Sequence, residues 1–262
     1  MIDKIEIGNT KLLTQSGHKM DVTNRNDKGY HTAITYLAPY DLSGHIVCPQ
    51  ASPACIELCL NTSGHGIFDS TQAARIKRTK YFYQDKKVFY DQLSKELNSH
   101  VRRSEKLGLI PNYRFNGTSD LIIEKIYPQL FNEFPNIIFH DYTKIDYRIR
   151  PVEKLPLNYD LTFSRSEINH DKAFKNIYNR RVSVVFSTKK DENLPKVFTY
   201  DGTEYDVIDG DLDDKQFLLD HNIVIGLRLK GDAQIKKFNH LSYLDSIGLR
   251  KYDNVKSFVW KV

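Results

Sequence analysis

The stretch Asn112-Tyr-Arg-Phe-Asn116-Gly-Thr-Ser-Asp120 joins a short run with aromatic residues to a polar end that contains glycine. A run of this length bounded by turn-forming residues predicts a β-strand. Similar runs occupy residues 33–37, 137–141, 160–164, 182–187 and 223–229. Longer helical or loop segments separate them, which is the pattern of a parallel sheet built from βα units. The sequence therefore predicts an α/β fold with the architecture of a (βα)6-like partial TIM barrel.

The longest helical stretch covers residues 70–107. Its apolar residues recur at helical spacings, at Ala73, Ile76, Tyr83, Phe89, Leu93, Leu97 and Val101. Gly108 then provides a helix-ending glycine. Residues 121–134 and 168–178 are predicted to form the next crossover helices, and Tyr200-Asp-Gly202 predicts a tight hairpin turn.

The composition is that of an ordinary globular protein, with 262 residues of which 40% are hydrophobic and 27% charged. We expect one domain over residues 1–262, with a core at about residues 33–231 and decorations at both termini. No apolar run approaches the length of a membrane helix, and the first residues lack the long apolar stretch of a signal peptide. A cytoplasmic protein without a membrane partner is therefore expected.

The net charge of +5 is modest, but basic residues gather at several places. They are Arg75, Lys77, Arg78 and Lys80, then Lys86-Lys87, Arg102-Arg103 and Lys189-Lys190. Such groups can neutralise phosphates, and they are also typical of solvated helix faces. A nucleic-acid or nucleotide partner is one interpretation, and a solvated surface is the other.

All three cysteines lie in one segment that follows the first predicted strand. It reads His45-Ile-Val-Cys48-Pro-Gln-Ala-Ser-Pro-Ala-Cys55-Ile-Glu-Leu-Cys59. Ser52 can cap a helix that has Pro53 at its first position. Cys55 and Cys59, four residues apart, are then predicted to project from one helix face, with Cys48 folding back to meet them.

Several states are open to these cysteines. A disulfide would leave an odd thiol and is unusual in a cytosolic protein, whereas buried inert thiols are a second ordinary outcome. Three thiolates at Cys48, Cys55 and Cys59 can hold a 4Fe–4S cluster with one open iron. With His45 or His65 they can instead form a Cys3His zinc site, but such sites more often use tightly spaced cysteine pairs. The spacing favours iron–sulfur over zinc.

Polar side chains follow the predicted strands at their carboxyl ends. In parallel βα folds these ends meet on one side, where ligands bind, so a shared pocket beside the cysteine loop is predicted. The candidate acids and bases are Asp120, Asp141 and Glu167. The candidate substrate-binding residues are Asn116, Thr118, Ser119, Lys144, Arg165, Arg228 and Lys230.

Each strand-end residue also has an ordinary structural interpretation. Ser119, Asp120 and Ser166 can cap the helices that follow, and the charged residues can form structural ion pairs. Asp209-Gly-Asp211 lacks the full spacing of an EF-hand calcium loop, so an acidic turn at the pocket edge is expected there.

Several motifs resemble those of the gene product 88 family of bacteriophage and mobile-element proteins, over about residues 33–231. They are Leu37-Ala-Pro, Cys48-Pro-Gln-Ala-Ser-Pro-Ala-Cys55, Cys59-Leu-Asn-Thr, Asn116-Gly-Thr-Ser-Asp120, Asp141-Tyr-Thr-Lys144, Phe163-Ser-Arg-Ser-Glu167, Asp209-Gly-Asp211 and Gly226-Leu-Arg-Leu-Lys-Gly231. The family has no settled activity, so this resemblance implies a phage origin and a place in the host cytoplasm.

The predicted topology also resembles that of radical S-adenosylmethionine enzymes. Those enzymes combine a six-unit partial barrel with three cysteines after the first strand and an open iron in a 4Fe–4S cluster. The resemblance implies S-adenosylmethionine as a cosubstrate. The spacing differs from their common Cys-x3-Cys-x2-Cys pattern, and no Gly-Gly-Glu-like segment follows the second predicted strand.

Three hypotheses follow. The first is a phage-type iron–sulfur protein acting on a nucleotide, a nucleic acid or a small phosphorylated substrate. The second is a nucleic-acid-binding or host-interaction protein with a structural metal, in which the basic residues of Arg75–Lys80 and Arg102-Arg103 contact phosphates. The third is a metal-dependent nuclease that uses Asp120, Asp141 and Glu167. The sequence leaves the reaction, the substrate and the oligomeric state open.

Overall fold

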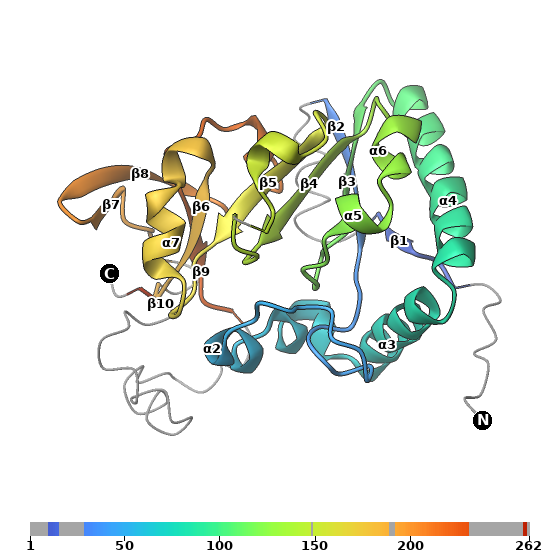
Figure 1. Ribbon diagram of the computed structural model, residues 1–262, viewed down its shortest axis with the longest axis horizontal. Helices are drawn as coiled ribbons and strands as arrows, with labels where there is room; N and C mark the ends of the chain where they lie inside the picture. The colour runs from blue at the N-terminus through green and yellow to red at the C-terminus, as the bar shows by residue number, and fades with distance from the viewer. Residues whose placement is uncertain (1–9, 16–28, 148, 189–191, 231–258, 261–262) are drawn as a thin grey trace.

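The computed structural model describes residues 10–15, 29–147, 149–188, 192–230 and 259–260 (Figure 1). Its central parallel strands are neighbours in the sheet in the same order as in the chain. They are β2 (Tyr30–Thr35), β3 (Ile110–Arg114), β4 (Ile138–Thr143), β5 (Tyr159–Ser164), β6 (Val182–Phe186) and β9 (Val224–Arg228). The predicted α/β fold with sequential parallel strands is confirmed, although β2 and β3 begin and end earlier than expected.

Further strands extend the sheet at both sides. β1 (Leu13–Thr14) pairs antiparallel with β2, and β8 (Thr203–Asp209) pairs parallel with β9. β7 (Val197–Tyr200) pairs antiparallel with β8, and β10 (Val259–Trp260) pairs with β6. The strand path ends at β1 and β7, and in the described part of the chain no pairing joins them. The sheet is therefore open and not a closed barrel.

The hairpin between β7 and β8 confirms the predicted turn. Asp201 and Gly202 have φ angles of 48° and 74°. Two consecutive residues with positive φ are what a tight two-residue hairpin requires, and Asp-Gly tolerates this conformation well.

The expected single helix over residues 70–107 is instead two helices, α3 (Asp69–Gln84) and α4 (Lys86–Lys106). The break lies at Asp85, whose backbone is extended and whose side chain accepts a hydrogen bond from the Val88 N–H at 2.9 Å. Asp85 is thus the N-cap of α4, a role that competes with a place inside a helix. Gly108 follows α4 with a φ of 65°, as predicted for a helix end.

The other connections contain short helices. α2 (Pro53–Glu57), η1 (Leu60–Thr62) and η2 (Gly64–Ile67) lie between β2 and α3. The crossover expected at residues 121–134 is split into α5 (Ile123–Ile126) and α6 (Gln129–Glu133) on either side of Pro128. α7 (His170–Lys175) and η4 (Ile177–Asn179) form the crossover expected at residues 168–178. η3 (Val152–Lys154) and η5 (Gln216–Leu218) lie in loops.

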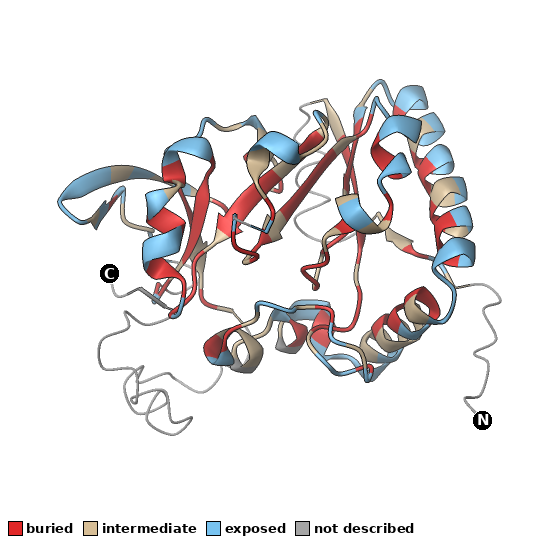
Figure 2. Cartoon of the chain, in the orientation of Figure 1, coloured by how far each residue is buried: buried red, intermediate tan, exposed pale blue. Residues whose placement is uncertain are grey.

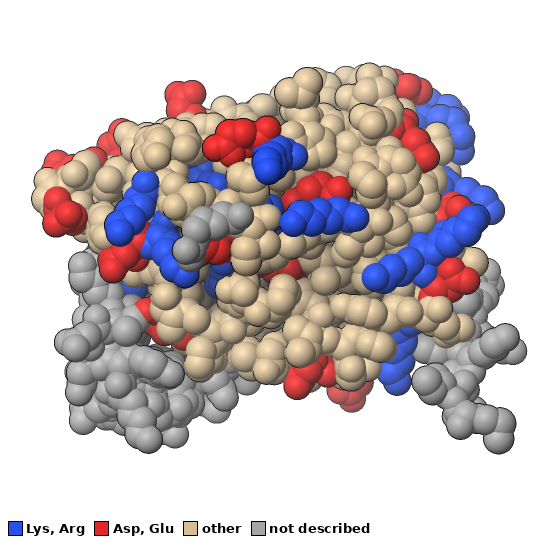
Figure 3. Space-filling view, viewed as in Figure 1, with Lys and Arg blue, Asp and Glu red and all other residues tan. Residues whose placement is uncertain are grey.

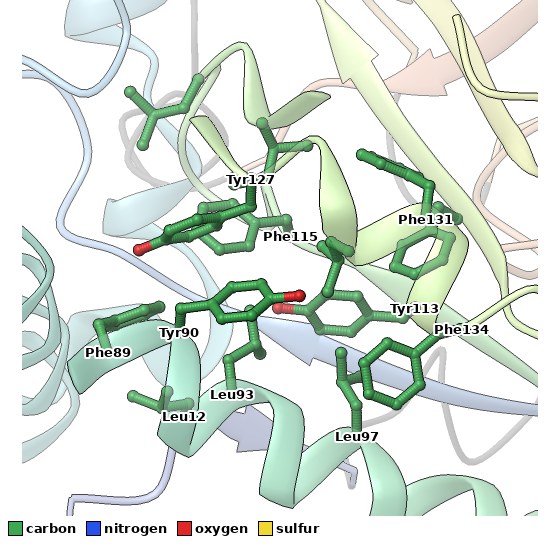
Figure 4. Packing of buried hydrophobic residues seen from close by; sticks show 14 of the residues in the cluster. Leu12, Phe89, Tyr90, Leu93, Leu97, Tyr113, Phe115, Tyr127, Phe131 and Phe134 are labelled. Atoms are coloured by element: carbon green, nitrogen blue, oxygen red, sulfur yellow. The ribbon is translucent and has the colours of Figure 1, made fainter. Parts of the chain in front are cut away.

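Two apolar clusters cover one face of the sheet. The larger one packs α4, α5 and α6 against β2 to β5, and it is rich in aromatic rings (Figure 4). Phe89, Leu93 and Leu97 project from α4 toward Tyr113 of β3 and toward Phe115, which directly follows this strand. A smaller cluster packs α7 against β6, β7 and β9. In Figure 2 the buried side of α4 accordingly faces the sheet and its outer side is exposed.

A pair of buried histidines lies between α4 and β2. The rings of His31 and His100 have centroids 4.5 Å apart, and His31 Nδ1 lies 2.8 Å from Ser104 Oγ. His100 Nε2 lies 3.2 Å from the carbonyl oxygen of Asn112. Burial lowers the pKa of both histidines, that of His100 to about 4, and the positive charge of Arg103 adds to this effect. Both rings are therefore neutral near pH 7.

We expect acid to destabilise the protein through this pair. The folded-state pKa of His100 lies below its unfolded value of about 6.5, so the unfolded chain binds more protons between these pH values. The contribution of His100 to the free energy of unfolding should fall by about 3 kcal/mol as the pH is lowered through this window. Urea titrations from pH 7 to pH 4 measure this slope.

His100→Gln provides the matched comparison, because an amide can bond Asn112 and does not titrate. Its slope should be flatter than that of the wild-type protein. Asp141, whose pKa is raised to about 6 by burial, acts in the opposite direction in both proteins and cancels from the comparison. Equal slopes for the two proteins would show that His100 does not contribute to the acid sensitivity.

Candidate functional site

The cysteine segment lies at the carboxyl ends of the parallel strands. In Figure 1, α2 and α3 lie together on the side toward which the β4 and β5 arrows point. The Asp120 N–H donates to the Val47 carbonyl at 2.8 Å and joins the segment to the turn after β3. Thr118 Oγ1 of the same turn donates at 2.5 Å to the carbonyl of Leu37, which follows β2. The predicted position of the cysteine loop beside the strand ends is therefore what the structure shows.

The polar turn after β3 approaches β2 very closely. Gly117 lies at this point, where an added Cβ would be 2.6 Å from Ile34 Cγ2 and 2.8 Å from the Thr35 carbonyl oxygen. A larger residue would push the turn away from β2 and from the cysteine segment. Glycine is therefore required at this position of the Asn116–Asp120 motif.

The start of α2 is as predicted, but its end is not. Ser52 caps the helix by accepting a hydrogen bond from the Cys55 N–H at 3.2 Å, and Pro53 occupies the first position. The helix ends at Glu57, and Cys59 has φ −58° and ψ 137°, which is outside the helical region. The expectation that Cys55 and Cys59 share a helix face is wrong, because the chain leaves the helix before Cys59.

The three thiols are unlinked, half-buried and close enough to interact. Electrostatic interactions join Cys48 with Cys55 and Cys59, and Cys55 with Cys59. Burial raises the pKa of the Cys48 thiol to about 12 and also raises that of Cys59. The ammonium group of Lys144 hydrogen-bonds the side chain of Cys55. Cys48 from a loop, Cys55 from α2 and Cys59 from the residues after α2 thus form one group around Lys144.

Glu167 holds α2 in place. Its carboxylate accepts hydrogen bonds from Ser52 Oγ at 2.7 Å and from the Ala54 N–H at 3.0 Å. Glu167 is buried and follows β5, so this contact ties the amino end of α2 to the end of a central strand. Ala54 also packs against Leu229, which directly follows β9. Glu167, a predicted acid or base, is thus engaged with the cysteine helix.

Asp141 lies within β4 and Asp120 in the turn after β3, and both belong to one buried network. Asp141 accepts hydrogen bonds from the Asn116 N–H at 2.9 Å, from Asn116 Nδ2 at 3.1 Å and from Tyr159 Oη at 2.9 Å. Asp120 accepts from the Lys144 N–H at 2.7 Å, and its Oδ1 lies 3.6 Å from Arg150 Nη1. Burial raises the pKa of both carboxyl groups, that of Asp141 to about 6.

The predicted helix caps in this region do not form. α5 begins at Ile123 without a side-chain cap, and Ser119 Oγ instead donates to Asn116 Oδ1 at 2.8 Å. α7 begins after Asn169, again without a side-chain cap, so Ser166 does not have this role either. Ser119 stabilises the turn after β3 through its hydrogen bond to Asn116.

The basic candidates divide into two groups. Arg165 is buried, and its Nε donates to His170 Nδ1 at 2.8 Å. Arg228 and Lys230 instead bind the acidic turn: Arg228 Nη1 is 2.8 Å from Asp209 Oδ2, and Lys230 Nζ is 2.5 Å from Asp211 Oδ1. Asp209 and Asp211 therefore neutralise two of the residues expected to bind an anion. The Gly231 and Lys189-Lys190 parts of the predicted motifs lie outside the described residues.

A small pocket opens beside the cysteine group. Its walls are formed by Gln50, Lys144, Asp146, Phe163, Ile168, Asn169 and Lys172. Lys172 Nζ lies 3.1 Å from Asp146 Oδ2, and Lys144 is shared with Cys55. The pocket thus combines polar side chains with one apolar wall directly next to a thiol.

Within the described ranges, no three His, Cys, Asp or Glu side chains are arranged to hold one metal ion. His45 stacks on Tyr83 with centroids 4.1 Å apart, and the His65 ring meets Phe68 edge-on at 5.8 Å. The predicted Cys3His arrangement is therefore not assembled in this structure. Asp120, Asp141 and Glu167, the residues of the nuclease hypothesis, bind different partners and do not form a common ion site either.

The predicted phosphate-binding residues of α3 are largely used inside the protein. Arg75 is buried and donates to Asn61 Oδ1 at 2.7 Å, and Arg78 donates to the carbonyl groups of Lys11 and Tyr36 at 2.8 and 3.3 Å. Figure 3 shows Lys and Arg interspersed with Asp and Glu on the face in view. These contacts support a structural role for Arg75 and Arg78.

Sequence reasoning missed Arg150. Its side chain is 1% exposed, and it donates to both carboxylate oxygens of Glu124 and to Tyr159 Oη at 2.7 Å each. It therefore connects α5, β5 and Asp120 at the strand ends. No local pattern around Arg150 indicates this, because its partners are distant in sequence.

The fold and the site together define an α/β protein with three neighbouring cysteines at the carboxyl ends of its parallel strands. The chain belongs to the gene product 88 family, whose model matches residues 5–241. No curated protein and no solved structure matches it. The resemblance to the gene product 88 family is confirmed, and the resemblance to radical S-adenosylmethionine enzymes gains no support from these comparisons. Among the described residues, no helix has both the length and the apolar character needed to cross a membrane.

We expect Glu167→Ala to release the cysteine helix. The change leaves Ser52 Oγ and the Ala54 N–H without their buried acceptor, which should reduce the free energy of unfolding by about 3 kcal/mol. The half-buried Cys55 should also react faster with a thiol reagent under native conditions. Chemical denaturation and mass spectrometry of alkylated peptides measure the two effects.

Glu167→Gln is the control, since its amide oxygen can still accept from Ala54 and its amide can still bond Ser52. It should retain most of the stability and the slow alkylation of the wild-type protein. If the alanine variant were as stable and as unreactive as the glutamine variant, the contact would not position α2.

Proposed function

We propose that the protein holds a 4Fe–4S cluster on Cys48, Cys55 and Cys59 and acts on a small anionic substrate beside it. The proposal is supported by one observation above all: the three thiols form a mutually interacting group at the carboxyl ends of parallel strands. This edge of a parallel sheet is where ligands bind in other α/β proteins.

The donor set fits a cluster better than a single ion. In a cubane each cysteine binds a different iron, so the three sulfur atoms surround a volume and do not converge on one point. Cys48, Cys55 and Cys59 interact with one another, and three cysteines are the number of protein ligands that such a cluster with one open iron takes. Burial raises the pKa of the Cys48 and Cys59 thiols and favours their protonated forms, and a coordinating metal would displace these protons.

The environment of the thiols supports an anionic substrate. When bound, a cluster with three protein ligands supplies one open iron and a capacity for electron transfer. The pocket beside Cys55 contains Lys144, which hydrogen-bonds that cysteine, and Lys172, which would exchange its partner Asp146 for a carboxylate or phosphate of the substrate. Asn169 and Gln50 add hydrogen-bonding groups. Asp120 lies next to the backbone of Lys144 and has a raised pKa, so it can hold a proton near the substrate.

The proposal also includes a partial-barrel architecture for the central sheet. The six central strands follow one another in parallel, and the cysteine segment follows the first of them. This is the order of a (βα)6 partial barrel, whose ligand site is expected at the carboxyl ends of the strands.

Anaerobically purified protein should be brown and contain about four irons and four sulfides per chain. Cys55→Ala and Cys59→Ala should each lose most of the iron and the visible absorbance. Ser63→Ala, in the exposed turn after Cys59, is the control and should retain both. Metal and sulfide analysis with absorbance spectra measures these outcomes.

The opposite result is equally clear. A colourless protein with one zinc per chain, lost in the same cysteine variants, would replace the cluster with a structural zinc site. A protein that takes up no metal after anaerobic reconstitution with iron and sulfide would leave the cysteines as buried thiols.

A further inference from the structure

The sheet has a second, polar face opposite the large aromatic cluster. Side chains alternate between the two faces of a strand, so Asn112 and Arg114 lie opposite Tyr113, which packs in that cluster. Tyr113 pairs with Phe139 on β4, which brings His140 beside Arg114 on the polar face. The Arg114 guanidinium lies 5.2 Å from the centre of the Tyr142 ring. Neighbouring strands thus place four polar or charged side chains together.

Several buried atoms on this face have no hydrogen-bond partner. Asn112 is 0% exposed, yet neither its amide oxygen nor its amide nitrogen is bonded. The same holds for His140 Nε2, Tyr142 Oη, Arg114 Nε and Gln216 Oε1. Buried polar groups in folded proteins are nearly always satisfied. Their concentration on one face indicates a polar ligand that these atoms bind.

The segment at residues 213–219 covers this face with its own side chains. The ring of Phe217 lies between Tyr30 and His140, with centroid distances of 5.3 and 4.7 Å. The carboxylate of Asp214 lies 3.1 Å from Arg114 Nη1. An aromatic ring and an anionic group, three residues apart, are thereby brought onto the polar face.

We propose that this face is a nucleotide-binding site in which Phe217 occupies the position of the base and Asp214 that of the phosphate. The Asn112 amide offers one donor and one acceptor, a pair that matches the hydrogen-bonding edge of adenine. Tyr30 and His140 provide the ring contacts, and Arg114 provides the charge for a phosphate.

The covering segment is not a strand of the sheet, so its displacement would break no strand pairing. Its internal hydrogen bonds are local: the Lys215 N–H donates to Asp213 Oδ1 at 3.0 Å, and Gln216 Nε2 donates to the Asp213 carbonyl at 2.9 Å. Arg114 and Arg181 hold it through Asp214 and the Leu219 carbonyl. The site includes none of the cysteines, so it stands or falls independently of the proposed cluster.

Isothermal titration of the full chain with adenosine monophosphate tests the site. Removing the competing ring in Phe217→Ala should tighten binding by about tenfold or more relative to the wild-type protein. Asp214→Asn, which removes the competing charge and keeps the side-chain shape, should also tighten it. Adenosine without phosphate should bind about tenfold more weakly than the monophosphate. Inorganic phosphate alone should not reproduce the binding of the monophosphate.

Two further variants complete the test. Leu218→Ala changes an exposed side chain of the same segment and should leave the affinity unchanged. Asn112→Leu, combined with Phe217→Ala, should abolish the gain. If folded Phe217→Ala and Asp214→Asn proteins bind the monophosphate no better than Leu218→Ala, the proposal is wrong and residues 213–219 are a structural cover over bound water.

Discussion

The contact between the Glu167 carboxylate and the amino end of α2 is the constraint on which the site depends. α2 has five residues, too few to be stable by itself, and its position is set by what it contacts. Glu167 fixes it to the end of β5 through Ser52 and Ala54, and Leu229 packs against it after β9. Because Cys55 lies in this helix and Cys59 follows it, the same contact determines where two of the three thiols lie.

A buried charge network stabilises the other side of the site. Arg150 is enclosed by Glu124, Tyr159 and Asp120, and Tyr159 continues the network to Asp141 and Asn116. Removing one member of such a network leaves another charge buried and unpaired, which is strongly destabilising. The turns that carry Asn116, Asp120 and Lys144 are therefore held rigidly. The cysteine group is assembled on a fixed edge of the sheet.

The sequence predicted those features that depend on local patterns. Short apolar runs located the parallel strands, and Ser52-Pro53 located the start of α2, because burial and capping act within a few residues. The break at Asp85 was missed because the apolar spacing continues across it. The short length of α2 was missed because Leu58 and Cys59 have no helix-ending signal. Arg228 and Lys230 pair with Asp209 and Asp211 because β8 and β9 are neighbours in the sheet. No local sequence pattern indicates that these two strands are neighbours.

The most direct test of the central claim is diffraction from anaerobically grown crystals, recorded at the iron absorption edge. We predict one compact anomalous peak bounded by the Sγ atoms of Cys48, Cys55 and Cys59, with Glu167 still bonded to Ser52 and Ala54. The absence of iron at this position in crystals of reconstituted protein, with Lys144 still bonded to a free Cys55 thiol, would contradict the account.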